Sequence, residues 1–231
     1  MELKKIFICQ SNYIPWKGYF DAINQADIFV IYDEMQYTKN DWRNRNKIKT
    51  SQGVQWLTIP VKLNFGQKIN EAKVSQLNWG KKHWKTLCQN YSKAPFFDEL
   101  KPQFEELYLN MTEENISEIN IKFIKEINNI LGITTTVIKS KDLIFEGDKN
   151  ERLIEICKQL NCNYYLSGPA AKSYMDSKLF TENDITVEFL DYSGYTEYQQ
   201  QFDGFEHGVS ILDLLFNKGE DSKNFLKFNK K

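Results

Sequence analysis

The chain has 231 residues, of which 41% are hydrophobic, 14% aromatic and 26% charged. This composition is typical of a globular protein with a sizeable core and excludes a disordered chain. The 30 basic and 31 acidic residues give a formal net charge of −1, so no overall field favours nucleic acid or an acidic membrane. Residues 39–49, however, hold five basic residues and one acidic residue, which favours a phosphate-sized partner.

The four cysteines and two histidines predict reduced core thiols rather than a zinc site. Only Cys157 and Cys162 lie close together in the sequence, and no second pair of ligands accompanies them. The apolar stretch at the start is too short for a signal peptide, and no apolar run has the length of a membrane span. We therefore expect a cytoplasmic protein without membrane insertion.

The first part of the chain predicts a parallel strand–loop–helix–strand unit. Residues 3–9 and 28–32 are short apolar runs typical of buried strands, and residues 18–26 have helical periodicity. Residues 34–50 lack hydrophobic periodicity and are expected to be irregular. Residues 54–61 predict a further strand, which Pro60 places at a sheet edge or at the strand's end.

Helical patterns dominate the middle of the chain. Helices are expected over 79–91, 96–109 and 113–131, with Gly132 as the C-terminal cap of the third. Thr112 and Asn115 form half of a capping box before that third helix.

The rest of the chain alternates between the two kinds of element. Strands are expected at 134–140, 163–166 and 185–190, helices at 149–160 and 209–217, and a broken helical stretch at 173–183. Ser210 and Asp213 have the spacing of a capping box at the start of the last helix.

This alternation predicts an α/β fold with a mostly parallel, doubly wound sheet and an inserted helical segment. No linker or repeat marks a second domain, so we expect one domain over 1–231 with a helical elaboration at about 79–131. Ligands of such sheets bind beyond the carboxyl ends of the strands, where the strand order reverses. Three loops that follow predicted strands, 10–17, 33–49 and 167–174, are therefore the candidate site.

The first candidate loop combines amide, phenol and indole side chains with a glycine at a helix start. A glycine in that place lets a ligand approach backbone N–H groups, which attract anions. The alternative is a turn packed by its own aromatic residues. The candidate binding residues are Gln10, Asn12, Tyr13, Trp16, Gly18 and Tyr19.

The second loop carries the strongest signal, because basic and amide residues are interleaved with aromatic ones. Arginine binds phosphate or carboxylate through two parallel hydrogen bonds, and aromatic faces stack on a base or a sugar. Solvated surface is one alternative, and RNA binding is another that the neutral net charge disfavours. The candidates are Asp33, Tyr37, Lys39, Trp42, Arg43, Asn44 and Arg45.

The third loop offers Ser167 and Gly168, whose hydroxyl and backbone N–H groups are candidate ligand contacts. Asp191 and Tyr192 follow the last predicted strand and are weaker candidates for polar contacts. The sequence contains no G-x-S-x-G motif and no cysteine–histidine signature, so no covalent nucleophile is indicated.

At these residues the chain resembles the WbqC-like protein family. The resemblance rests on the first loop, on residues 26–30 and 56–61, on 165–168 and 210–213, and on Tyr37-Thr38-Lys39 with Asp41-Trp42-Arg43-Asn44-Arg45. It spans nearly the whole chain, although Ser11 stands where proline is usual. Proteins of this family are known mainly from clusters that build O-antigen and other surface polysaccharides, and a glycine transferase role has been proposed for one branch.

A second, looser resemblance is to nucleotidyltransferase-like α/β folds, whose first strand is followed by a short motif ending in glycine-histidine. Trp16-Lys17-Gly18-Tyr19 stands in that place here, with tyrosine instead of histidine. This resemblance concerns the fold alone.

The family resemblance and the second loop lead to one functional hypothesis: an aminoacyl transferase, with glycine as one candidate, that acts on the amino group of a nucleotide-linked amino sugar. In it, catalysis involves three residues: Asp33 takes the ammonium proton, Lys39 stabilises the oxyanion, and Arg43 holds the diphosphate with Arg45. Trp42 and Tyr37 stack on the base or sugar, and Asn44 and Asn12 recognise polar edges.

The second substrate in this hypothesis is an activated amino acid, whose carrier stays open. The activated amino acid is expected as an adenylate made with ATP and magnesium, as a thioester, or as a charged tRNA. A charged tRNA would be the only nucleic acid that the protein binds. No metal ligands are assigned, and the oligomeric state is left open. The alternatives are a non-catalytic subunit that holds the sugar nucleotide and a nucleotidyltransferase-like, adenylate-forming enzyme.

Overall fold

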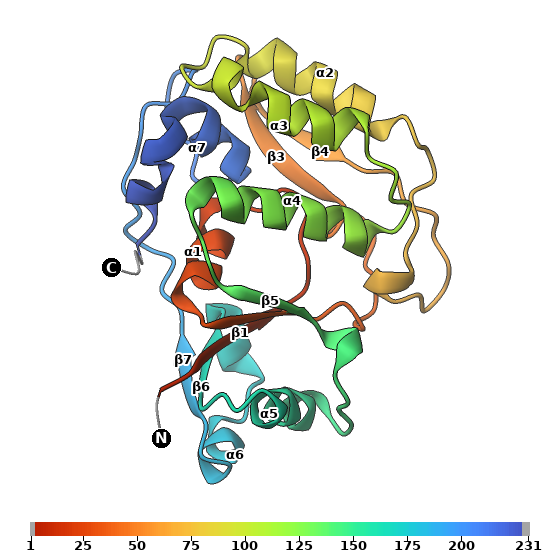
Figure 1. Ribbon diagram of the computed structural model, residues 1–231, viewed down its shortest axis with the longest axis vertical. Helices are drawn as coiled ribbons and strands as arrows, with labels where there is room; N and C mark the ends of the chain where they lie inside the picture. The colour runs from red at the N-terminus through yellow and green to blue at the C-terminus, as the bar shows by residue number, and fades with distance from the viewer. Residues whose placement is uncertain (1–2, 228–231) are drawn as a thin grey trace.

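The computed structural model describes residues 3–227 and has a five-stranded parallel sheet at its centre (Figure 1). Residues 1–2 and 228–231 of the predicted domain lie outside this range. The strands are β1 (Lys5–Cys9), β2 (Ile28–Ile31), β5 (Thr136–Lys139), β6 (Tyr164–Ser167) and β7 (Thr186–Phe189). Every neighbouring pair is parallel. The predicted α/β class and the mostly parallel sheet are confirmed.

The sheet supports a core on each face, because successive residues of a strand point to opposite sides. Phe7 of β1 belongs to the core beneath α1 (Lys17–Gln25) and α4 (Ile116–Leu131). Ile6 and Ile8 belong to the core formed with α5 (Lys149–Gln159) and α6 (Ser177–Glu182). Figure 1 shows these two helix pairs on opposite sides of the strands, which is the doubly wound arrangement.

The strand order is β5-β2-β1-β6-β7. The chain passes from β1 outward to β2 and β5 on one side, and then returns to β6 and β7 on the other. β1 and β6 are therefore the neighbours at which the order reverses, and their carboxyl ends flank a crevice. Those ends are Cys9 and Ser167.

A hairpin outside the main sheet corrects the prediction for the second loop. β3 (Arg45–Thr50) lies in the stretch expected to be irregular, and it pairs antiparallel with β4 (Gly53–Thr58). The sequence shows no alternation of apolar and polar residues here, because Ile48 is the one apolar residue of β3. The neighbouring inward position is Asn46, whose Nδ2 donates to the carbonyl oxygen of Ile14 at 2.9 Å. A hydrogen-bonded amide thus takes the place of an apolar residue.

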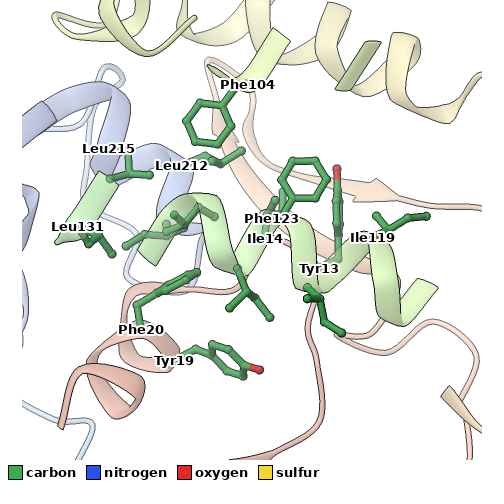
Figure 2. Close-up of a cluster of buried hydrophobic side chains, with 14 of the residues drawn as sticks. Tyr13, Ile14, Tyr19, Phe20, Phe104, Ile119, Phe123, Leu131, Leu212 and Leu215 are labelled. Atoms are coloured by element: carbon green, nitrogen blue, oxygen red, sulfur yellow. The ribbon is translucent and has the colours of Figure 1, made fainter. Parts of the chain in front are cut away.

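The helical segment consists of α2 (Trp79–Tyr91), α3 (Phe97–Leu109) and α4. α4 begins three residues later than predicted, because Asn115 rather than Thr112 is the cap. The side chain of Asn115 accepts from the backbone N–H groups of Ser117 at 2.9 Å and Glu118 at 3.3 Å. Figure 2 shows how side chains from the first loop and from α1, α3, α4 and α7 (Ile211–Lys218) meet in the larger core.

At the start of α7 the expected capping box is only half present. Ser210 accepts from the backbone N–H of Leu212 at 3.3 Å, as a cap does. The carboxylate of Asp213 instead accepts from the hydroxyl groups of Tyr91 at 2.9 Å and Tyr198 at 2.8 Å. This buried carboxylate ties the C-terminal helix to α2. None of the described helices has the length and apolar character needed to cross a membrane.

Candidate functional site

A cavity of about 870 Å³ lies at the crevice between the carboxyl ends of β1 and β6. Its volume is in the range of small-molecule and cofactor sites. All three candidate loops reach it, although they are far apart in the sequence. The predicted residues that line it are Gln10, Asn12, Trp16, Tyr19, Trp42, Arg43, Ser167 and Gly168. Tyr192, a weaker candidate, also lines it.

Arg43 is a firmly held cation in the cavity wall. Its two terminal nitrogens donate to the side-chain oxygens of Asn12 and Gln10. Both acceptors are neutral amides, and the carboxylate oxygen of Asp41 is 3.9 Å from the guanidinium. The side chain therefore has a fixed direction, and its two hydrogen-bond acceptors carry no charge of their own. Such a group is suited to bind a phosphate or carboxylate.

Asp33 supports this arrangement from behind the cavity. It is only 3% exposed, and its two oxygens accept from the backbone N–H of Ser11 at 2.8 Å and from the hydroxyl of Ser117. Burial raises the pKa of Asp33, and the hydrogen bonds and Arg43 act in the opposite direction. On α4, Asn120 donates to the hydroxyl of Ser11 at 3.1 Å and to the carbonyl of Arg43 at 2.9 Å. Asp33 is thus a buried anchor for the first loop and does not line the cavity.

Gly18 makes room for an aromatic side chain rather than for a ligand. A Cβ atom at this position would lie 2.3 Å from the ring of Trp16. That ring also makes an edge contact with Tyr192, with 5.2 Å between ring centroids. Since Trp16 occupies the space beside the helix start, the expected approach of a ligand to the Gly18 backbone is closed.

The other predicted residues lie outside the cavity wall. Tyr13 is fully buried, with its hydroxyl 2.8 Å from Nδ1 of His83. Asn44 is buried and donates to the carbonyl of Ile59 at 2.9 Å. Tyr37 is 7% exposed, Lys39 is an exposed turn residue, and Arg45 stacks on Trp56 of the hairpin.

The start of α5, which was not among the predicted site segments, forms a further wall of the cavity. Asp148, Lys149 and Arg152 all line it. Asp148 is the helix cap, and one of its carboxylate oxygens accepts from the backbone N–H groups of Asn150 at 2.7 Å and Glu151 at 2.9 Å. A signal was available: the segment that leads into α5 follows a parallel strand, as the three candidate loops do, so it emerges at the same edge of the sheet.

The charge of the cavity wall is predominantly positive. Arg43, Lys149 and Arg152 face one acidic residue, Asp148. Lys149 lies over the ring of Tyr174, with its ammonium 4.5 Å from the ring centroid, so α5 and the segment after β6 meet at the cavity rim. This arrangement favours a ligand with one or more anionic groups and aromatic or sugar rings.

The cavity offers no activated nucleophile among the described residues. Cys9 lines it, but burial raises the pKa of its thiol to about 11, so it is protonated at neutral pH. No histidine is among the lining residues. Within residues 3–227, no three histidine, cysteine, aspartate or glutamate side chains are grouped so as to hold a metal ion.

The fold and site together define a doubly wound α/β protein with a predominantly basic cavity at the switch point of its sheet. The chain belongs to the WbqC-like protein family, which matches residues 10–225. It is 47% identical over 228 residues to the uncharacterized protein Rv1507c of Mycobacterium tuberculosis, an alignment that covers 98% of this chain and 99% of that protein. No solved structure shows significant similarity to the chain.

Proposed function

We propose that the cavity binds a nucleotide-linked amino sugar and that the protein transfers an activated amino acid, such as glycine, to the sugar's amino group. The observation that carries this proposal is Arg43, which Gln10 and Asn12 hold in a fixed direction at the switch point. Two further cations, Lys149 and Arg152, line the same cavity. The family's occurrence in clusters for surface polysaccharides agrees with a substrate of this kind.

The roles in this proposal follow from charge and position. Arg43 binds the diphosphate, and Trp42 stacks on the base or the sugar. Arg152 and Lys149 bind a second negative group. Asp148 orients the ammonium of the sugar, since it is the acidic residue of the wall and the backbone caps only one of its oxygens.

The reaction needs no covalent intermediate with the protein. The free amine attacks the carbonyl carbon of the activated amino acid, a C–N bond forms, and the bond to the leaving group breaks with its electron pair. The ammonium loses one proton to water before the attack, and the nitrogen loses a second proton, to the leaving group or to water, as the amide forms. The cations of the wall stabilise the negative charge that develops on the oxyanion and on the leaving group. In this reaction Asp33 is a positioning residue, and Lys39, which lies outside the wall, has no assigned part.

Substrate binding tests the role of Arg43. Arg43→Ala should weaken the binding of a UDP-linked amino sugar by more than tenfold, because a charged hydrogen bond contributes about 1.5–3 kcal/mol. Lys39→Ala is the matched control, since it removes a cation of the same loop that does not line the cavity. Calorimetry that gave equal affinities for wild type and Arg43→Ala would reject the assigned role.

Product analysis tests the reaction itself. The purified protein is incubated with the UDP-linked amino sugar, glycine and each candidate carrier, and a new amide is sought by mass spectrometry. Amide formation that depends on the protein supports the transferase.

A second candidate function is a non-catalytic subunit that presents the sugar nucleotide to a partner enzyme. It is favoured by the protonated state of Cys9 and by the lack of histidine among the described residues that line the cavity. Tight binding of the sugar nucleotide without turnover, with every carrier, would favour this candidate. Release of pyrophosphate from ATP would instead indicate adenylate formation by the protein itself.

A further inference from the structure

The β3–β4 hairpin exposes an aromatic and basic surface beside the cavity. Because side chains alternate along a strand, its buried face includes Ile48 and Leu57, and the opposite face carries Arg45 and Lys47 of β3 with Val54 and Trp56 of β4. Lys47 and Trp56 are directly opposite each other in the register. Trp56 is 39% exposed and Val54 48%. These four residues are called the outer hairpin face below.

The two cations of this face pack against an aromatic ring and form no ion pair within residues 3–227, although Arg45 is near enough to Asp41 to help lower the pKa of that carboxyl. The guanidinium of Arg45 lies 4.1 Å from the centroid of the Trp56 ring, and the ammonium of Lys47 lies 5.4 Å from it. Neither residue hydrogen-bonds or ion-pairs through its side chain with any residue in the described range 3–227, and the Nε of Arg45 is buried without an acceptor. Lys49, the next residue on the same side of β3, is different: its ammonium donates to Gln200 at 3.0 Å and to the carbonyl of Phe202 at 2.8 Å.

Trp42 joins this face to the cavity. It lines the cavity and is 42% exposed, and its ring centroid is 5.5 Å from that of Trp56. A ligand on the outer hairpin face therefore lies next to a ligand in the cavity without competing for Arg43, Lys149 or Arg152.

We propose that the outer hairpin face binds a second ligand, the nucleotide portion of the acyl donor, an inference that rests on the proposed function. An exposed tryptophan stacks on a base, and two cations against its ring bind the adjoining phosphate. A neutral sugar would use the ring of Trp56 and leave both charges unmatched. Adenylates, coenzyme A thioesters and the 3′ end of a charged tRNA all carry the required chemistry, a base joined to phosphate.

The binding test uses three probes: adenosine monophosphate, coenzyme A and a short single-stranded RNA that ends in CCA. We expect the wild-type protein to bind at least one of them. Trp56→Ala should weaken that binding roughly fivefold or more, the effect of removing one stacked base. Gln55→Ala is the matched control and should leave binding unchanged, because Gln55 is an exposed residue of β4 whose side chain points to the other side of the hairpin. Trp56→Phe should retain most of the binding. Lys47→Gln is a second variant, which acts through charge and should reduce the salt dependence of binding.

The pattern across two ligands separates this inference from the proposed function. Trp56→Ala should leave the affinity for the UDP-linked amino sugar unchanged, and Arg43→Ala should leave the affinity for the bound probe unchanged. Binding of a probe at the outer hairpin face without any binding of the amino sugar would reject the proposed function and keep the second site. The second site is refuted if no probe binds. It is also refuted if Trp56→Ala weakens the binding of the UDP-linked amino sugar rather than the binding of the probe. The probe that binds most tightly identifies the class of donor.

Discussion

The role of Asp33 can be decided by one isosteric substitution. As a general base, Asp33 would need an oxygen that reaches the substrate. In the structure both oxygens are occupied, by the backbone N–H of Ser11 and by the hydroxyl of Ser117, and the side chain is 3% exposed. Asp33→Asn keeps an oxygen for Ser11 and presents an N–H₂ group to Ser117, whose hydroxyl can turn to accept. The variant therefore preserves the support of the first loop and removes the capacity to take a proton.

A general base and a positioning residue at Asp33 predict rate losses of different size. Removal of a general base typically lowers the rate by about 10²–10⁴-fold. Loss of charge at a positioning residue should lower it by less than about tenfold, because the hydrogen-bond geometry survives. We expect Asp33→Asn to lose about 1 kcal/mol of unfolding free energy, since weaker hydrogen bonds are offset by relief from burying a charge. Asp33→Ala should lose about 2–4 kcal/mol, because it leaves two buried donors without an acceptor.

The assay combines urea denaturation with calorimetric titration of the UDP-linked amino sugar and with the rate of amide formation. Binding is included because it reports the position of Asn12 and Arg43 even without turnover. A variant Asp33→Asn with normal stability and affinity but a rate reduced by more than about a hundredfold would refute the positioning role and restore Asp33 as the base.

Further predictions concern the core, the cavity wall and the unused thiol. Burial lowers the pKa of His83 to about 4, below its value of about 6.5 in the unfolded chain, so wild type should lose up to about 3 kcal/mol of stability as the pH falls from 7 to 4. His83→Gln should lack this loss of stability at low pH. If urea denaturation gave the same pH dependence for both proteins, His83 would not be its source. Gly18→Ala should lower the free energy of unfolding by about 1–3 kcal/mol, because the added methyl group displaces the ring of Trp16. The melting temperature should fall and the tryptophan fluorescence should change; if neither changes, the close contact between Gly18 and Trp16 is disproved. Arg152→Gln should weaken sugar-nucleotide binding about tenfold, while Lys158→Gln, outside the cavity wall, should not; equal effects would argue against a specific contact. Cys9→Ser should retain activity, and a complete loss with an intact fold would indicate a covalent mechanism instead.

Local patterns predicted most of the main sheet and most helices, because those elements carry hydrophobic periodicity. β1 and β2 are continuous apolar runs, as strands buried on both faces require. β3 escaped prediction because its inward positions include Asn46, which the first loop satisfies through hydrogen bonds rather than through apolar contact. Asp213 had the spacing of a cap but is used as an acceptor for Tyr91 and Tyr198, which come from other parts of the chain.

The candidate site was predicted in part, by a rule about strand ends rather than by any motif. The rule found Gln10, Asn12 and Arg43, which meet in the structure. It could not separate Arg43 from Arg45, because a sequence does not show where a turn ends and a strand begins. Arg43 lies in the turn and reaches the cavity, whereas Arg45 opens β3 and stacks on the outer hairpin face.

The amino-acid sequence alone determined the family, the α/β class and the three loops that reach the cavity, because these depend on residue types and on short-range periodicity. Only the tertiary structure decided that β1 and β6 are neighbours and that the start of α5 closes the cavity opposite Arg43. It also decided that Asp33 faces Ser117 of α4 rather than a ligand. These contacts join segments far apart in the chain, and they follow from the strand order and from the packing of helices on both faces, which no local pattern encodes.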